Sequence, residues 1–192
     1  MVEAYSIGEA KTHVIPYLRH EPSWFVIVGP GSGNEVNEVC KRWPKCKLLG
    51  IEPSRASFAA AKQIWPQHGC LLSTGLWSRP SILPVQDPDT LLKTVVTEEA
   101  TSEEYIHCTT LDKICTFYGV HNGLLWVSIN GGEAEVLKGG GPALTLGAFR
   151  SAVVKVRPKE ATDVLTFMGG ASFKLDHVFM SCPQSFKGLF VK

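Results

Sequence analysis

A short glycine-rich segment and an acidic residue farther along the chain have the residue types and the spacing expected of a ligand-binding site. The segment 29–33 reads G-P-G-S-G after an unbroken apolar run, and Glu52 ends the next apolar run. Glycine lacks a side chain and tolerates positive φ, so such a segment can turn sharply and let a ligand approach the backbone. A carboxylate at the end of a neighbouring strand can accept hydrogen bonds from both ribose hydroxyls of an adenosine. Together they predict a nucleoside-binding site, although a plain tight turn and a solvated strand end are the simpler alternatives.

The spacing of the glycines distinguishes among nucleotide cofactors. A dinucleotide fingerprint requires G-x-G-x-x-G, and a P-loop requires a lysine followed by serine or threonine. This segment has G-x-G-x-G and no such lysine. Glu35, two residues after it, would repel a pyrophosphate but is compatible with the ammonium and sulfonium charges of S-adenosylmethionine. The loop therefore favours S-adenosylmethionine, and a nicotinamide-dependent oxidoreductase is the less favoured alternative.

The elements predicted around this segment are those of a parallel sheet. Continuous apolar runs indicate strands that are covered on both faces. Asn34 and Ser54 are placed to cap the helices that follow the first two strands. This alternation of strand and helix is what right-handed crossovers require. The sequence predicts strands over 24–28, 47–53 and 70–74 and helices over 34–43 and 55–65.

The remainder of the chain extends the same sheet. We expect 1–192 to form a single α/β domain with a mostly parallel seven-stranded sheet, an antiparallel C-terminal hairpin and helices on both faces. A helical lead-in, short or kinked at Pro16, occupies 1–22. Prolines at 80, 84 and 88 predict an irregular insertion over 79–104, with short strands near 93–96 and 105–108. Further strands are expected over 124–129, 152–156, 175–180 and 188–191, and further helices over 110–118, 133–138 and 162–168.

Composition narrows the classes of partner and compartment. The 192 residues carry a formal net charge of +1. The chain thus lacks the surplus of basic residues that would indicate nucleic acid as a binding partner. None of the six cysteines forms a C-x-x-C pair or has a histidine at zinc-ligand spacing, which predicts free thiols in a reducing compartment. The first twenty residues lack the apolar core of a signal peptide, and no apolar run approaches a membrane span. We therefore expect a cytoplasmic protein without membrane contact, of unknown oligomeric state.

Four segments carry a family resemblance. V-G-P-G-S-G at 28–33 and G-I-E-P at 50–53 look like the first two cofactor motifs of a wide superfamily. T-T-L-D-K-I at 109–114 and G-G-E-A-E-V-L-K-G at 131–139 look like two more specific segments, T-L-D and E-G-A-E-x-x-V-L-K-G. Over roughly 24–157 the chain thus resembles the FkbM-type methyltransferases. The resemblance implies a Rossmann-like methyltransferase fold, S-adenosyl-L-methionine as the cofactor, and O-methylation of a small molecule or glycan.

The resemblance also implies roles for particular residues. The glycine segment and Glu52 would hold the cofactor, with Leu76 and Trp77 beside its adenine. Glu133 is the candidate general base, although a carboxylate at a helix N-terminus also simply favours the helix dipole. The predicted cofactor-binding residues are Gly29, Pro30, Gly31, Ser32, Gly33, Glu52, Leu76 and Trp77; the predicted catalytic residues, facing the acceptor, are Glu133, Ser128 and Asn130; no metal is expected.

Departures from the family pattern suggest a second function. The family usually has K-I-D-V-E-G before its helix, whereas 126–131 reads W-V-S-I-N-G here. Trp126, Ser128 and Asn130 thus replace a lysine, an aspartate and a glutamate, and Ile27 replaces an acid before the glycine loop. Such losses remove a general base and a metal ligand. The alternative is a non-catalytic methyltransferase-like binding or scaffold module that has lost its catalytic acidic residues.

Overall fold

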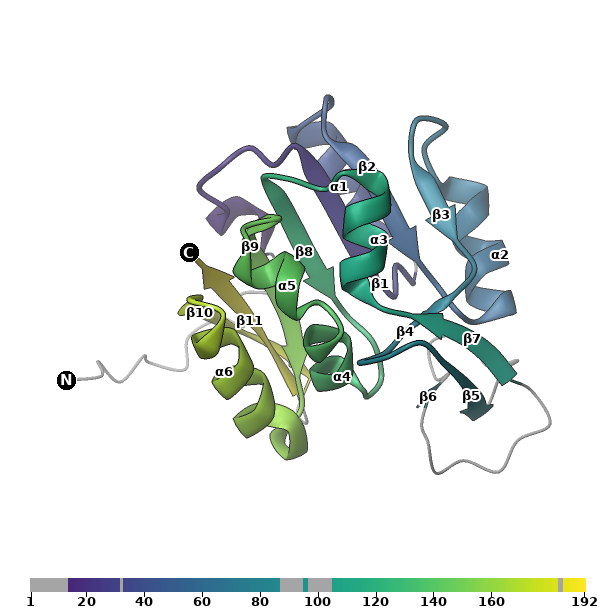
Figure 1. Ribbon diagram of the computed structural model, residues 1–192. Helices are drawn as coiled ribbons and strands as arrows, with labels where there is room; N and C mark the ends of the chain where they lie inside the picture. The colour runs from purple at the N-terminus through teal and green to yellow at the C-terminus, as the bar shows by residue number, and fades with distance from the viewer. Residues whose placement is uncertain (1–13, 32, 87–94, 97–104, 183–184) are drawn as a thin grey trace.

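A seven-stranded sheet forms the centre of the molecule (Figure 1). The computed structural model describes residues 14–31, 33–86, 95–96, 105–182 and 185–192. The strand order is β10-β11-β9-β8-β1-β2-β3, parallel except for β11, which runs antiparallel to both β9 and β10. The predicted sheet with its C-terminal hairpin is therefore confirmed. The strands are β1 (Trp24–Val28), β2 (Lys47–Ile51), β3 (Cys70–Leu72), β8 (Gly123–Val127), β9 (Phe149–Val156), β10 (Lys174–Cys182) and β11 (Ser185–Val191).

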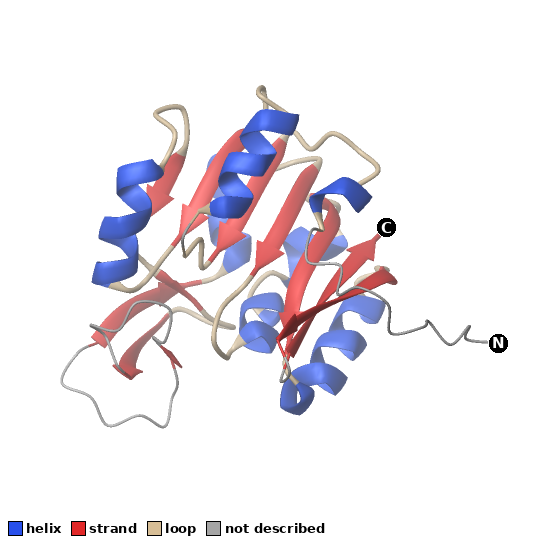
Figure 2. Ribbon diagram, turned by 180° about the vertical axis from the view of Figure 1, so that it is seen from behind, coloured by secondary structure: helices blue, strands red, loops and turns tan. Residues whose placement is uncertain are grey.

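Helices cover both faces of this sheet (Figures 1 and 2). Every residue of β1 and β8 is buried, as their continuous apolar runs predict. Phe25 and Ile27 pack with the first helix, whereas Val26 and Val28 pack with the helices of the other face. The helices are α1 (Asn34–Arg42), α2 (Arg55–Ile64), α3 (Leu111–Tyr118), α4 (Glu133–Lys138), α5 (Gly141–Thr145) and α6 (Ala161–Gly170), with 3-10 turns η1 (Ile15–Tyr17) and η2 (Pro158–Glu160).

Both predicted helix starts, at 34 and 55, are confirmed, but of the two predicted caps only the one at Ser54 is confirmed. The Ser54 hydroxyl accepts a hydrogen bond from the Ser57 amide at 3.3 Å, as expected of a cap. Asn34 is not a cap, because α1 is entered from Gly33 in a left-handed conformation (φ 71°) without a side-chain cap. α5 was not expected after the glycines at 139–141. It begins at Gly141, separated from α4 by two glycines, with Pro142 in its first turn, where the missing N–H has no intrahelical partner to lose.

A small second sheet lies beside the main one, in the order β4-β7-β5-β6. The expectation of an irregular segment at 79–104 is wrong for β5 (Ser81–Gln86), which passes through Pro84. Pro84 is tolerated because it occupies the last pair of the β5–β7 ladder, opposite Tyr105, where it removes a single donor. The rest of 79–104 lies largely outside the described residues. The other strands are β4 (Gly75–Leu76), β6 (Val95–Val96) and β7 (Tyr105–Thr109).

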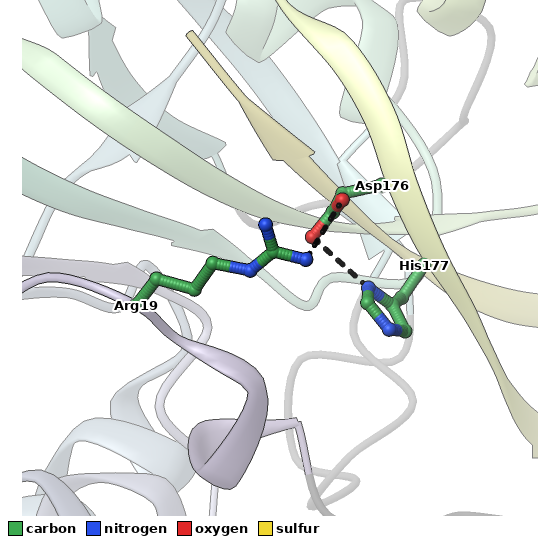
Figure 3. A network of polar contacts seen from close by, with 3 residues as sticks. All are labelled: Arg19, Asp176 and His177. Carbon is green, nitrogen blue, oxygen red and sulfur yellow. Dashed lines mark hydrogen bonds and ion pairs between the residues drawn. The ribbon is translucent and has the colours of Figure 1, made fainter.

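The segment that precedes β1 packs onto the C-terminal hairpin. Of the predicted helical lead-in, residues 1–13 lie outside the described residues, and the described part is the single turn η1. Asp176 of β10 lies 3.6 Å from the Arg19 guanidinium and 3.0 Å from His177 Nδ1 (Figure 3). The exposed Arg19 makes this ion pair a weak contribution. Burial of Ile15 and the neighbouring apolar side chains is therefore what attaches the segment to the sheet.

Candidate functional site

A cavity of about 330 Å³ lies at the carboxyl ends of the parallel strands. It lies between the neighbouring strands β1 and β8. On one side of this pair the sheet continues with β2 and β3, and on the other side it continues with β9. Such a reversal of strand order is where open α/β sheets bind ligands. The lining residues come from the ends of β1, β2, β8 and β9 and from two helices: Gly29, Pro30, Gly31, Glu35, Glu52, Pro53, Ser57, Ser128, Ile129, Asn130 and Lys155.

The glycine loop is shaped by the close approach of β1 and β8. Gly29 has φ of 76°, and a Cβ at this position would lie 2.7 Å from the Ser128 carbonyl oxygen. The Ser128 amide donates to the Val28 carbonyl at 3.0 Å, which keeps the two strand ends together. Gly31 also lines the cavity with positive φ. Gly33 instead packs against Ile64 and starts α1, and the predicted contact at Ser32 lies outside the described residues.

Glu52 faces the same cavity as the glycine loop. Its side chain is only 7% exposed, and Oε1 accepts a hydrogen bond from the Ser54 amide at 3.0 Å. Burial raises the pKa of Glu52 to about 7, although the Ser54 hydrogen bond opposes the shift. A largely desolvated carboxylate at the rim of a cavity is a strong acceptor for ligand hydroxyl groups. The two features that the sequence predicts to act together do share one cavity.

The wall formed by β8 and β9 is polar and carries a lysine. Ser128 and Asn130 line it, and their predicted role of facing an acceptor stays a prediction. The Asn130 Oδ1 atom accepts from Lys155 Nζ at 3.0 Å and from Arg157 Nη2 at 3.1 Å. The sequence analysis missed Lys155 and Arg157. Their spacing at the end of a buried strand was the available signal, because alternate residues share one face of a sheet.

Glu133, the predicted general base, does not lie at the cavity wall, where it would have to contact an acceptor. It is completely buried and does not line the cavity. Its carboxyl group faces that of Glu160, and burial together with this neighbour raises the pKa of Glu133 to about 8. Burial also acts to raise the pKa of Glu160, but hydrogen bonds from Glu133 and from the Gly132 and Ala134 amides outweigh it and lower that pKa. The raised pKa keeps Glu133 protonated near neutral pH, and the catalytic role of Glu133 stays a prediction.

Leu76 and Trp77 lie outside the cavity, and the Trp77 ring packs against the loop that precedes α4. Both are buried and neither lines the cavity, so their predicted contact with adenine stays a prediction. The Trp77 amide donates to the Thr109 carbonyl at 2.9 Å. Its ring packs on Gly132, where a Cβ would lie 2.7 Å from Trp77 Cζ3. The small sheet therefore holds the loop that carries Asn130 and leads into α4.

The described residues contain neither a cluster of metal ligands nor a helix that could span a membrane. Within those residues, no group of three or more histidine, cysteine, aspartate or glutamate side chains is arranged to hold a metal ion. No helix in the same part of the chain has the length and apolar character that a membrane span requires.

Comparison with known proteins places the fold. No protein-family model matches the sequence, and no curated protein matches it either. Ribosomal protein L11 methylase from Lactobacillus delbrueckii subsp. bulgaricus aligns at 14% identity over 93% of this chain and 74% of that chain, with a TM-score of 0.54. Precorrin-6y C5,15-methyltransferase from Geobacter metallireducens GS-15 aligns at 11% identity over 93% and 86%, with a TM-score of 0.55. This chain has the Rossmann-like methyltransferase fold.

A chain of a fibrillarin/Nop5p complex shares the same fold. It aligns at 9% identity over 90% of this chain and 74% of that chain, with a TM-score of 0.56. At such low identities the shared property is the fold, and the more specific FkbM resemblance is not confirmed by any family model.

The contact between Gly29 and Ser128 predicts the result of one substitution. Gly29→Ala should lower the free energy of unfolding by about 2–4 kcal/mol, because it adds a steric clash to left-handed backbone strain. Gly119→Ala is the matched control, since Gly119 has φ of 65° but nothing within 4 Å of its Cβ position. That control should cost only about 1 kcal/mol. Urea unfolding followed by tryptophan fluorescence measures both; equal losses would show that the approach of the strand ends imposes no constraint.

The buried carboxyl pair predicts how stability depends on pH. The folded-state pKa of Glu133, about 8, lies above the ordinary value of 4.5. The contribution of protonated Glu133 to the free energy of unfolding is therefore fully present below pH 4.5, and it is lost as the pH rises towards 8. Glu133→Gln stays neutral and can donate to Glu160. The stability of this variant relative to the wild type should therefore increase by about 2 kcal/mol between pH 5.5 and 7.5. Urea unfolding at several pH values tests this, and parallel stability curves for the two proteins would contradict it.

Proposed function

We propose that this chain is an S-adenosylmethionine-dependent methyltransferase whose cavity at the β1–β8 junction holds the cofactor. The observation that carries the proposal is the placement of Glu52 in one cavity with Gly29 and Gly31. The methyltransferase fold supports it, as does the similarity to two solved proteins with that fold, ribosomal protein L11 methylase and precorrin-6y C5,15-methyltransferase. A volume of about 330 Å³ is within the range of small-molecule sites.

The residues present fit this cofactor. Glu52 is a buried acceptor for the two ribose hydroxyls, and the glycine loop leaves its backbone open to the amino-acid portion. Glu35 adds a carboxylate to the wall, which suits a ligand with ammonium and sulfonium charges. The sulfonium supplies an already activated methyl group. The protein's task is therefore mainly to align the acceptor, which Ser128 and Asn130 border at the end of β8.

The acceptor class follows from the FkbM resemblance. The segments at 109–114 and 131–139 support assignment to that branch, and with it O-methylation of a small molecule or glycan. The structure adds that Trp77 and the small sheet fix the second of these segments behind the cavity. A cytoplasmic location, without nucleic acid or membrane as a partner, remains part of this proposal.

A non-catalytic binding module is the second candidate. One observation favours it: Glu133 is buried beside Glu160 instead of lining the cavity. The carboxylates among the described lining residues are Glu35 and Glu52, which the cofactor proposal already uses. Under this candidate, the cofactor binds and no methyl group is transferred.

Calorimetric titration with S-adenosylhomocysteine tests the cofactor site. Glu52→Ala should weaken binding by about 1–3 kcal/mol, because the ribose hydroxyls lose their acceptor. Wild-type affinity should rise as pH increases through about 7, where Glu52 ionises, and Glu52→Gln should remove this dependence. Glu21→Gln, a change at an exposed carboxylate outside the cavity, is the control and should leave affinity unchanged.

The outcomes separate the candidates. Methyl transfer to a member of a panel of hydroxylated small molecules and glycans supports the enzyme. Binding with no transfer to any of them supports the non-catalytic module. An absence of S-adenosylhomocysteine binding at millimolar concentration contradicts both, and unchanged affinity in Glu52→Ala shows that the ribose is held elsewhere.

A further inference from the structure

Three cationic side chains gather at one edge of the cavity. Lys155 of β9 lies directly opposite Lys187 of β11 in the antiparallel ladder, so the two share one face of the sheet. Arg157 follows two residues after Lys155, at the end of β9, on the same side. All three are partly buried. Placing a cation where water is partly excluded costs free energy unless an anion or a dipole compensates its charge. The groups that each of these three side chains contacts therefore indicate what it does.

Lys187 is committed to its own partners. Its Nζ atom lies 3.2 Å from Glu35 Oε1 of α1 and 5.0 Å from the centre of the Trp126 ring. This pairing partly offsets the negative charge that Glu35 presents to the cavity. Lys187 therefore acts within the wall, on Glu35 and Trp126, and is not itself a candidate for binding a ligand.

Arg157 is held between a carboxyl pair and an amide. Its positive charge helps to stabilise ionised Glu133, whose pKa it acts to lower against the effect of burial. Its Nη2 atom donates to Asn130 Oδ1 at 3.1 Å. Arg157 thereby fixes the orientation of the Asn130 amide, which in turn accepts from Lys155 at 3.0 Å. The Asn130 amide oxygen thus orients the Lys155 ammonium.

Lys155 is the member of this group that lines the cavity. The neighbouring wall residues from β8, Ser128 and Asn130, are uncharged. The Lys155 ammonium thus stands beside the region where an acceptor would meet the methyl group. A partly desolvated, oriented ammonium is well suited to a carboxylate or phosphate oxygen, because charge-assisted hydrogen bonds are stronger than neutral ones.

Resting on the proposed function, we propose that the methyl acceptor carries an anionic group, a carboxylate or a phosphate monoester, that Lys155 binds. Asn130 and Arg157 are positioning residues, because they hold the ammonium at the cavity wall. The uncharged side chains at 128 and 130 leave that wall free of carboxylates that would repel such an acceptor.

Ligand-observed NMR titrations test the anion site with three matched probes: benzoate, phenyl phosphate and the neutral benzamide. The protein is first saturated with S-adenosylhomocysteine. At least one anion should bind about tenfold or more tightly than benzamide, and Lys155→Met should remove this preference while leaving benzamide binding unchanged. Lys155→Arg should retain it. The preference between benzoate and phenyl phosphate identifies which anionic group the acceptor carries.

Lys174→Met, at an exposed lysine of β10, is the matched control and should bind the anions as the wild type does. Lys155→Met should also keep the wild-type affinity for S-adenosylhomocysteine. Equal binding of all three probes, or an unchanged anion preference in Lys155→Met, overturns the inference. So does competition between the anions and S-adenosylhomocysteine, since Lys155 would then bind the cofactor's own carboxylate.

The same titrations without S-adenosylhomocysteine separate this inference from the proposed function. If the wild type fails to bind S-adenosylhomocysteine but still prefers anions through Lys155, the methyltransferase proposal fails and the anion site stands. If it binds S-adenosylhomocysteine and shows no anion preference, the cofactor site stands and the anionic acceptor is wrong.

Discussion

The close contact between the ends of β1 and β8 is the constraint on which the site depends. The Gly29 backbone and the Ser128 carbonyl meet where any side chain at position 29 would intrude. That contact brings the loop after β1, which starts α1, next to the loop after β8, which leads to α4. Glu52 reaches the same point because β2 pairs with β1 in register, and the Gly29 amide donates to the Ile51 carbonyl. One backbone contact thus brings three strand ends around one cavity.

The charged groups around this cavity are arranged at different depths. Glu52 is buried at the rim and has a pKa near neutrality, so its charge responds to pH and to a bound ligand. Glu133 is fully buried and does not line the cavity; it lies beside the partly buried Glu160, and the charge of Arg157 acts on it. Arg157 and Asn130 connect this pair to Lys155 at the cavity wall. A change in ionisation of the carboxyl pair would therefore alter the electrostatic environment of the cavity without direct contact with a ligand.

The sequence predicts the elements better than it predicts the contacts between them. Continuous apolar runs identify β1 and β8 because burial on both faces leaves no polar position. The helix α1 begins at Asn34 as predicted, but the predicted cap at Asn34 is wrong because the chain enters the helix from Gly33 in a left-handed conformation, without a side-chain cap. The spacing of Lys155 and Arg157 indicates only that they share a face of the sheet, because the place of Lys155 beside Asn130 depends on β9 pairing with β8. The burial of Glu133 similarly depends on how α4 packs against α6.

The central claim is that an adenosyl ligand lies in the bend after β1, held by a carboxylate of the neighbouring strand. A crystal structure of the protein soaked with S-adenosylhomocysteine tests it most directly. We expect both ribose hydroxyls within hydrogen-bond distance of the Glu52 carboxylate and the amino-acid portion against the backbone of Gly29 and Gly31. A ligand bound elsewhere, with Glu52 still bonded to Ser54 and remote from any ribose, would contradict the account.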